Sequence, residues 1–318
     1  MQLVAILLIT VSVLTFLSGL AVMLGSKKGD RLRSAWFFAA TIFATVWMVT
    51  IGLFLDAKPD WEPHMTSLVN ATFISAIFID IALLGYISWH KRIGQITTMI
   101  FLFLGIVFAI VFICKPSLLY TDIVITNAGN SLVSNIGPFY FTYVAFFCAL
   151  VPAVILTLLQ QIFRSSSDRI KNGDVVLLIG FAISGTMSLI FNLILPFWTW
   201  NLVWVGPLAI STTIIAFYIT ILRYRALALE SHWLKLLSYI VILASIAVLY
   251  MVVFYIIFTA MFRGARPSTE VIVLNFIMVL FFLLLMPAMN ELLTFVRSLI
   301  SNQNQNKAKN TDKNKKEA

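Results

Sequence analysis

The residue best placed to do chemistry in this sequence is a carboxylate inside an apolar run. Asp80 stands near the middle of the apolar stretch 66–89. A charged side chain within a membrane is costly unless it is paired, protonated or hydrated, so Asp80 is expected to face the interior of a helix bundle. Ser184 and Thr186 are its predicted hydroxyl partners, because each lies about 15 Å along its helix from the same membrane face. Asp80 is interpreted either as a switch that responds to a proton or a ligand, or as a hydrogen-bonded clamp between helices.

Asn192 is a second polar residue within an apolar run, and Pro196 follows it by four positions. Proline lacks a backbone N–H, so a carbonyl group of the preceding helical turn loses its partner. The Asn192 amide is therefore predicted either to satisfy such freed carbonyl groups or to line a pocket in the outer part of the bundle.

Tryptophans lie near the ends of apolar runs that are expected to face one side of a membrane. Tryptophan rings ordinarily anchor such ends among the lipid headgroups. The alternative is a hydrophobic mouth for a ligand, and on this hypothesis Trp198 and Trp204 are candidate site residues. The tryptophans concerned are Trp61, Trp198, Trp200 and Trp204.

The elements that must position these residues are predicted to be membrane-spanning helices. Apolar residues make up 61% of the chain and charged residues 11%, whereas soluble domains contain roughly 25% charged residues. About 20 apolar residues suffice to cross a bilayer core of roughly 30 Å. The predicted fold is an all-α polytopic transmembrane bundle of about nine spans, at approximately 2–25, 34–56, 66–89, 96–114, 138–163, 174–198, 206–226, 233–262 and 269–297.

The distribution of basic residues predicts the orientation of this bundle. Of the 22 Lys and Arg residues, 18 fall in alternate connections between the apolar runs or in the C-terminal tail. Under the positive-inside rule, the N-terminus is outside and the tail is cytoplasmic. The net charge of +9 is explained by loops and a tail that face anionic lipid. The lipid bilayer of the cell membrane is therefore an expected partner, and nucleic acid is not.

One long connection carries a signal for β structure. The β-branched run 123–126 is followed by Asn127-Ala128-Gly129-Asn130 and then by Leu132-Val133. A turn sequence between two apolar segments of this kind predicts a short β-hairpin. Its expected role is either a lid over an extracellular pocket or a packed cap on the helix ends.

Cysteine and histidine residues are sparse. Cys114 and Cys148 are expected to be buried thiols at different depths, which argues against a disulfide between them. Neither they nor the three histidines have the paired spacing of a metal-ligand set. No metal site and no cofactor are predicted.

Several local sequences together resemble a known sensory module. They are the hairpin-bearing loop that ends in Gly137-Pro138-Phe139-Tyr140, the Asn192 to Pro196 pair, Gly206-Pro207, and Arg223-Tyr224-Arg225 at the end of the seventh run. Residues 1–226 resemble the seven-helix sensory region at the N-terminus of certain bacterial histidine kinases. The resemblance implies a receptor-like module that detects an extracellular or membrane-embedded stimulus. The expected domains are this region, two additional spans with an amphipathic end at 227–300, and a disordered basic cytoplasmic tail at 301–318.

The chain departs from that family after the seventh run. A histidine kinase needs a phosphoacceptor histidine and a glycine-rich ATP site. His232 lacks the acidic-then-proline surroundings of a phosphoacceptor, and Asn302 and Asn306 lie in a low-complexity tail. No phosphate-binding loop or nucleophile elbow occurs, so no enzymatic activity is predicted.

The expected function is that of a membrane sensor that signals through a separate cytoplasmic or membrane partner in response to a small ligand. The alternatives are a small-molecule transporter and an accessory membrane subunit. A transporter would need several polar groups at the midplane and usually an inverted repeat. The sequence shows one clear acidic residue there, Asp80, and no such repeat.

Overall fold

A computed structural model describes most of the first 223 residues of the chain. The chain divides into two units, Met1–Ile242 and Leu243–Ala318, and all the described residues belong to the first. The predicted eighth and ninth spans and the tail lie outside the described residues. The described ranges are 3–26, 28–56, 61–89, 92–126, 131–165, 167–194 and 202–223.

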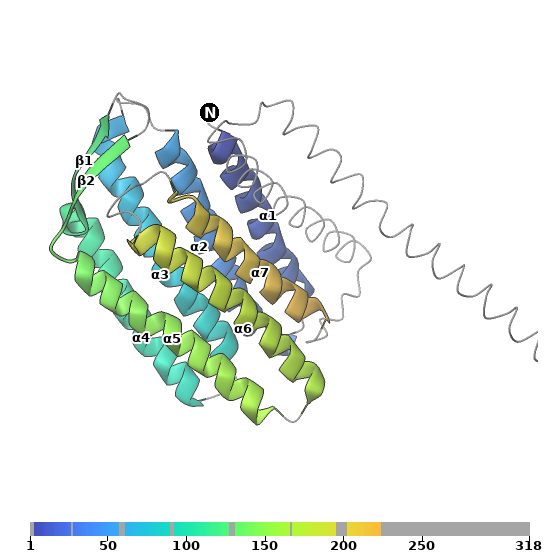
Figure 1. Ribbon diagram of the computed structural model, residues 1–318. Helices are drawn as coiled ribbons and strands as arrows, with labels where there is room; N and C mark the ends of the chain where they lie inside the picture. The colour runs from blue at the N-terminus through green and yellow to red at the C-terminus, as the bar shows by residue number, and fades with distance from the viewer. Residues whose placement is uncertain are drawn as a thin grey trace, which may run out of the picture. The chain divides into compact units, whose positions relative to one another are not determined.

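The described residues form a bundle of helices with one β-hairpin at its end (Figure 1). Six of the helices are long and apolar enough to cross a membrane, and α7 contains a shorter apolar stretch, Val205–Tyr218. The predicted all-α class is confirmed for this part of the chain, and these helices fit the seven spans expected there. The helices are α1 (Leu3–Gly25), α2 (Arg31–Leu55), α3 (Glu62–Ser88), α4 (Arg92–Cys114), α5 (Tyr140–Arg164), α6 (Asp168–Ser188) and α7 (Val205–Arg223).

Short segments connect or extend these helices. The 3₁₀ turns η1 (Lys28–Asp30) and η3 (Pro116–Leu118) precede α2 and follow α4, respectively. The end of α6 continues as a π-helical segment, η4 (Leu189–Ile194). Because π-helical turns are rare and frequently occur at functional sites, the end of α6 is a candidate position for such a site.

Helix α3 is the most enclosed of the candidate spans and α4 the least. In the most apolar part of each, 78% of the residues are buried in α3 and 17% in α4. Small and polar residues gather at helix interfaces in membranes, because lipid solvates apolar side chains as well as a protein core does. The α3 residues Asn70, Thr72 and Ser75 follow this rule, since all three are buried. Helix α3 therefore forms the centre of the bundle.

Helices α6 and α7 approach closely through small residues. A Cβ atom at Gly180 would lie 2.7 Å from the Cβ atom of Ala216. The Thr213 hydroxyl donates to the Gly180 carbonyl at 3.0 Å, and the Thr220 hydroxyl donates to the Gly173 carbonyl at 3.4 Å. Hydroxyl-to-carbonyl bonds of this kind hold transmembrane helices together.

The predicted β-hairpin is confirmed. Strands β1 (Tyr120–Thr126) and β2 (Ser131–Ile136) pair antiparallel, with an irregularity between Thr121 and Val124. The Tyr120 ring anchors β1 to the bundle, because it lies 5.5 Å from the Phe73 ring and 5.4 Å from the Tyr140 ring. Burial raises the pKa of Tyr120 well above its ordinary value, so its hydroxyl stays protonated at neutral pH.

Gly137 allows the chain to return from the hairpin into α5. Its N–H donates to the Leu119 carbonyl at 2.7 Å. A Cβ atom at this position would lie 2.2 Å from the Leu118 carbonyl oxygen, so any side chain would force the two segments apart. We call the end of the bundle that carries β1 and β2 the hairpin end, and the opposite end, which carries η1, the basic end.

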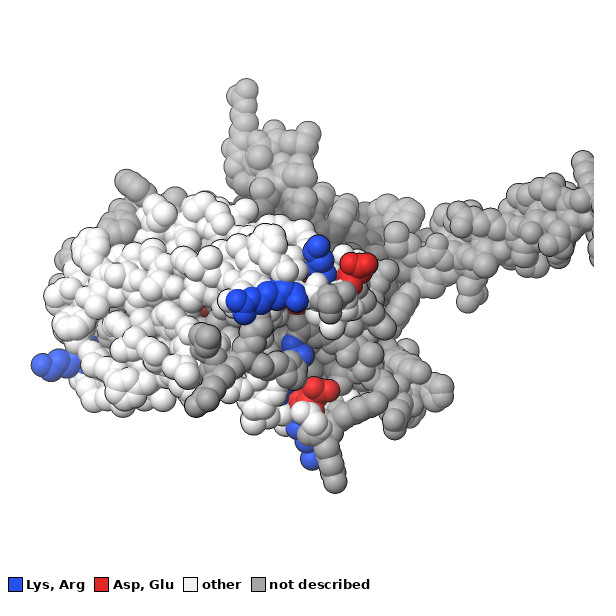
Figure 2. Space-filling view, turned by 90° about the horizontal axis from the view of Figure 1, so that it is seen from below, with Lys and Arg blue, Asp and Glu red and all other residues white. Residues whose placement is uncertain are grey.

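On the face of the molecule seen from below, charged side chains gather in one region, with a further basic side chain apart from them (Figure 2). Exposed examples near the ends of α2, α5 and α6 are Arg31, Arg164 and Lys171. The prediction that Cys114 and Cys148 are buried is wrong, since both are exposed. They lie on outward faces of α4 and α5, where a thiol, which behaves as a small apolar group, is compatible with lipid.

Candidate functional site

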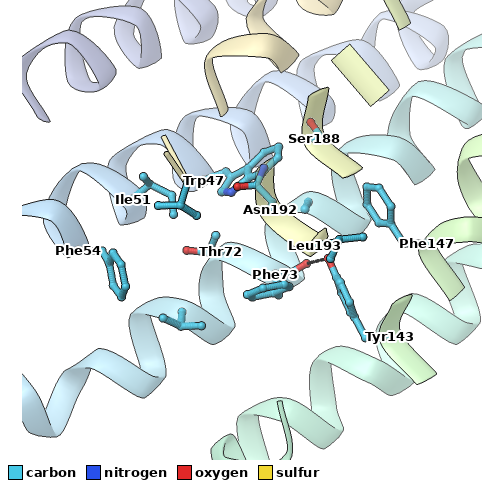
Figure 3. A pocket seen from close by; sticks show the side chains of 13 residues that line it. Trp47, Ile51, Phe54, Thr72, Phe73, Tyr143, Phe147, Ser188, Asn192 and Leu193 are labelled. Carbon is cyan, nitrogen blue, oxygen red and sulfur yellow. Dashed lines mark hydrogen bonds between the residues drawn. The ribbon is translucent and has the colours of Figure 1, made fainter. Parts of the chain in front are cut away.

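A small cavity lies inside the hairpin half of the bundle. Its volume is about 20 Å³, and Figure 3 shows the side chains around it. The walls come from α2, α3, α5, the π-helical segment η4 and the turn before α7. The residues that line it are Trp47, Ile51, Phe54, Val69, Thr72, Phe73, Ala76, Tyr143, Phe147, Ser188, Asn192, Leu193 and Val203.

Three of these side chains carry buried polar atoms that have no hydrogen-bond partner among the described residues. The atoms are Trp47 Nε1, Ser188 Oγ, and both Oδ1 and Nδ2 of Asn192. Trp47 is 3% exposed, Ser188 4% and Asn192 8%. Buried polar atoms are nearly always satisfied in folded proteins, so several unpartnered ones around one cavity are unusual. We refer to these three residues as the polar triplet.

Ser188, the last residue of α6, lines the cavity together with Asn192 of the π-helical segment. The Leu193 carbonyl of this segment, which a regular helix would satisfy from within, accepts a hydrogen bond of 2.6 Å from the Tyr140 hydroxyl. The Asn192 amide therefore does not serve that carbonyl group. Of the two interpretations of Asn192, the geometry agrees with the second, a residue that lines a pocket.

Gly206 makes room for Asn192 in this position. A Cβ atom at Gly206 would lie 1.6 Å from Asn192 Nδ2 and 2.6 Å from Asn192 Cγ. The amide consequently rests directly on the backbone of the first turn of α7. Any side chain at position 206 would displace it.

The α3 wall of the cavity is held by hydrogen bonds to its neighbours. The Thr72 and Thr50 hydroxyls are 3.1 Å apart, which joins α3 to α2. The Tyr143 hydroxyl of α5 donates to the Phe73 carbonyl at 3.3 Å, and their rings meet edge to face at 5.0 Å. The aromatic wall is thus fixed in place, and Figure 3 shows Trp47 and Asn192 beside it.

Asp80 lies one helical turn beyond Ala76, which lines the cavity, on the same face of α3. It is 4% exposed, as expected of an interior residue. The predicted pairing with Ser184 or Thr186 is wrong. The Ser184 hydroxyl bonds to the Thr213 hydroxyl of α7 and lies 3.2 Å from the Phe181 carbonyl, while Thr186 is exposed. The rotation of α6 about its axis explains this result, because it directs Ser184 toward α7.

The candidate tryptophans have different environments. Trp198 lies outside the described residues. Trp204 is 6% exposed, so its ring packs within the protein, whereas Trp61 is 42% exposed. Trp204 is not among the residues that line the cavity, although its neighbour Val203 is. A role for Trp198 or Trp204 in ligand binding stays a prediction.

Comparison with known proteins bears on the identity of this bundle. A family model described as the N-terminal 7TM region of histidine kinase matches residues 6–230. The chain belongs to this family. No curated protein and no solved structure matches it.

Membership of the histidine-kinase 7TM family confirms the resemblance predicted for residues 1–226. With its six candidate spans, the chain is a multi-pass membrane protein. All the residues that line the cavity, from Trp47 to Val203, fall within the matched range 6–230. The cavity is therefore a feature of the 7TM region itself.

At the basic end of the 7TM region, side chains from two neighbouring helices bind the last turn of α3. The Arg33 side chain donates through Nε to the Tyr86 carbonyl at 3.3 Å and lies 4.4 Å from the centre of the Tyr86 ring. The Gln161 side chain donates to the Ile87 carbonyl at 2.6 Å. Carbonyl groups in the last turn of a helix lack helical partners, and a cation there also interacts favourably with the negative end of the helix dipole. Helix α3 is thus linked to α2 and α5 at this end.

Sequence reasoning missed Trp47 and Ser188. Neither has a signal that separates it from an ordinary lipid-facing tryptophan or a serine bonded within its own helix. Gly206 was noticed only as part of a motif, and the reason for it is the contact with Asn192. Among the described residues, no group of three or more His, Cys, Asp or Glu side chains could hold a metal ion.

Proposed function

We propose that this chain is the sensory component of a membrane signalling system and passes its signal to a separate protein. The observation that carries the proposal is the cavity in the hairpin half of a 7TM region that belongs to the histidine-kinase family. Unpartnered polar groups inside an apolar bundle are costly for stability, and such groups are tolerated where they serve a function. The proposal assigns no catalysis to the chain.

The hairpin end faces outward and the basic end faces the cytoplasm in this proposal. The support is the charge asymmetry, since 18 of the 22 basic residues belong to one set of alternate connections and the tail. The stimulus is a small molecule that reaches the hairpin half from outside or from within the bilayer. The β-hairpin then lies above the cavity half and acts as its lid or cap.

The structure suggests how a change at the cavity would reach the basic end. Helix α3 lines the cavity through Thr72, Phe73 and Ala76. The last turn of the same helix is held by Arg33 and Gln161. A displacement of α3 would therefore alter contacts with α2 and α5 at the cytoplasmic surface, which is the kind of small helix shift that signalling proteins use.

In this proposal the output lies with a separate protein, and residues 227–318 themselves carry no kinase signature. In this proposal residues 1–226 are the sensory domain, 227–300 add two spans, and 301–318 form a basic tail that faces anionic lipid. A transporter or an accessory subunit is the alternative. A transporter would need several polar groups at the midplane and usually an inverted repeat, whereas the sequence shows one clear acidic residue there, Asp80, and no such repeat, which favours the sensor.

Photo-crosslinking in cells tests the proposal. A photoreactive amino acid at Lys171, an exposed position at the basic end, is expected to capture a histidine kinase or a response regulator. The matched control carries it at Trp61, which is also exposed but at the hairpin end, and should capture neither. Purified chain in proteoliposomes should catalyse no substrate flux, and flux that is lost in Asp80→Asn would contradict the proposal in favour of a transporter.

A further inference from the structure

We propose that the cavity is a binding site for one molecule of water, which bridges α2 to the π-helical segment through the polar triplet. The proposal rests on three residues, from α2 and from α6 with its π-helical extension, that line one cavity and carry buried polar atoms without a hydrogen-bond partner among the described residues. The inference concerns the same cavity as the proposed sensor function, but its test follows the Trp47 indole alone, so its failure is distinguishable from a failure of the sensor function, which the crosslinking tests.

The size of the cavity sets the size of its occupant. A cavity needs on the order of 10–15 Å³ to hold one water molecule, and this one measures about 20 Å³. One water molecule fits, whereas a ligand with several heavier atoms requires the walls to move. Apolar cavities of similar size stay dry, so the chemistry of the lining decides the occupant.

The lining supplies what a water molecule needs. Trp47 Nε1 is a donor only, Ser188 Oγ both donates and accepts, and the Asn192 amide provides a donor and an acceptor. A buried water molecule typically makes about three hydrogen bonds to otherwise unsatisfied groups. The indole N–H donates to the water oxygen, the water donates to Asn192 Oδ1, and the Ser188 hydroxyl completes the set.

The charge of the site favours a neutral occupant. Among the thirteen lining residues only Tyr143 has an ionisable side chain, and its phenol is neutral at pH 7 and donates to the Phe73 carbonyl. A bare ion would find no countercharge in this lining, and the burial of an unpaired charge is strongly unfavourable. Water meets the hydrogen-bonding requirement at no electrostatic cost.

Water-edited solid-state NMR of the full chain in lipid bilayers tests the site directly. The probe is bulk water, and the signal is the ¹⁵N indole resonance of Trp47, assigned by its loss in Trp47→Phe. Polarisation from water is expected to reach the Trp47 indole although this residue is only 3% exposed. Trp61, at 42% exposure, provides the reference for contact with solvent.

Two variants remove the other members of the polar triplet. Ser188→Ala and Asn192→Leu are each expected to weaken the transfer to Trp47 and to lower the melting temperature by about 2–4 °C. Ser18→Ala is the matched control, because Ser18 is equally buried and bonds within α1 to the Thr15 carbonyl; it should leave the Trp47 signal unchanged. If either variant fails to fold, the transfer from water to the Trp47 indole of the wild-type protein still tests the proposal.

A dry cavity gives the opposite results. The Trp47 indole of the wild-type protein then receives no polarisation from water. Asn192→Leu in that case raises the melting temperature, because it removes unsatisfied polar atoms and keeps a similar volume. Either result would overturn the proposal.

Discussion

Single residues in this bundle divide into those with a partner and those without one. Asn70 is fully engaged as a donor, since its Nδ2 reaches the Phe112 carbonyl at 3.3 Å and the Pro116 carbonyl at 3.0 Å. Asp80 is buried as well, but its predicted partner Ser184 bonds to Thr213 of α7 instead. A clamp between helices requires a bonded partner. The interpretation of Asp80 as a switch rather than a clamp stays a prediction.

Substitution of Asp80 tests this interpretation through stability. We expect Asp80→Asn to fold with unchanged stability, and Asp80→Leu to raise the free energy of unfolding by about 1–3 kcal/mol, because a buried polar group without a partner is removed. Unfolding in mixed micelles, followed by circular dichroism, provides the measurement.

Ser184→Ala is the control for Asp80, because it breaks the bond between Ser184 and Thr213 that joins α6 to α7. It should lower the free energy of unfolding by about 0.6–2 kcal/mol. If both Asp80 variants lose more stability than this control, Asp80 is a clamp and the switch hypothesis is wrong.

At the scale of elements, the π-helical segment η4 and the start of α7 form one structural unit. The Leu193 carbonyl accepts from Tyr140 of α5 at 2.6 Å, and Asn192 rests on Gly206. The cavity geometry therefore depends on three helices that meet around one irregular turn. Such a junction has few ways to relax when its packing is changed.

Gly206→Ala tests this junction. The new methyl group would overlap Asn192 Nδ2, so we expect a loss of about 1–3 kcal/mol in the free energy of unfolding. Asn192→Ala in the same chain should recover most of the loss, because it removes the atoms that clash; such non-additivity is the mark of residues in contact.

Gly29→Ala is the matched control for Gly206→Ala. A Cβ atom at Gly29 meets nothing within 4 Å, so its effect should stay within about 0.5 kcal/mol. Thermal unfolding in one detergent compares all of these variants. Equal effects at positions 29 and 206, or a double variant no better than Gly206→Ala, would contradict the assigned contact.

At the scale of the whole molecule, the two ends of the bundle differ in their basic residues. The exposed residues Arg164 and Lys171 mark the basic end, and the β-hairpin marks the other. The hydrophobic runs and the basic residues in alternate connections together predict an odd number of spans with the C-terminal tail in the cytoplasm. That count includes two spans outside the described residues.

Topology reporters test this arrangement. Alkaline phosphatase, which is active only outside the cytoplasm, is expected to be active when fused after Ser117 and inactive after Ser167. A fluorescent protein that matures only in the cytoplasm should be fluorescent after Ser167 and after Ala318. Phosphatase activity at Ala318 would indicate an even number of spans and would refute the count of nine.

The sequence alone determined the membrane class, the helices of the described part, the β-hairpin and the family. These features are local, because a run of about 20 apolar residues is long enough to span a bilayer whatever its neighbours are. The hairpin is local as well, because its strands β1 and β2 follow each other closely along the chain. The distribution of basic residues over alternate connections can also be read from the sequence alone, and the topology reporters test the orientation that it predicts.

Only the tertiary structure decided which polar groups meet. Trp47 comes from α2, and Ser188 and Asn192 come from α6 and its π-helical extension. Their meeting depends on the rotation of each helix about its axis and on the change from α- to π-helix, neither of which hydropathy records. The same rotation directed Ser184 toward Thr213 and left Thr186 exposed. Depth in a membrane can be counted along a chain, whereas the direction of a side chain is set by the packing of its helix.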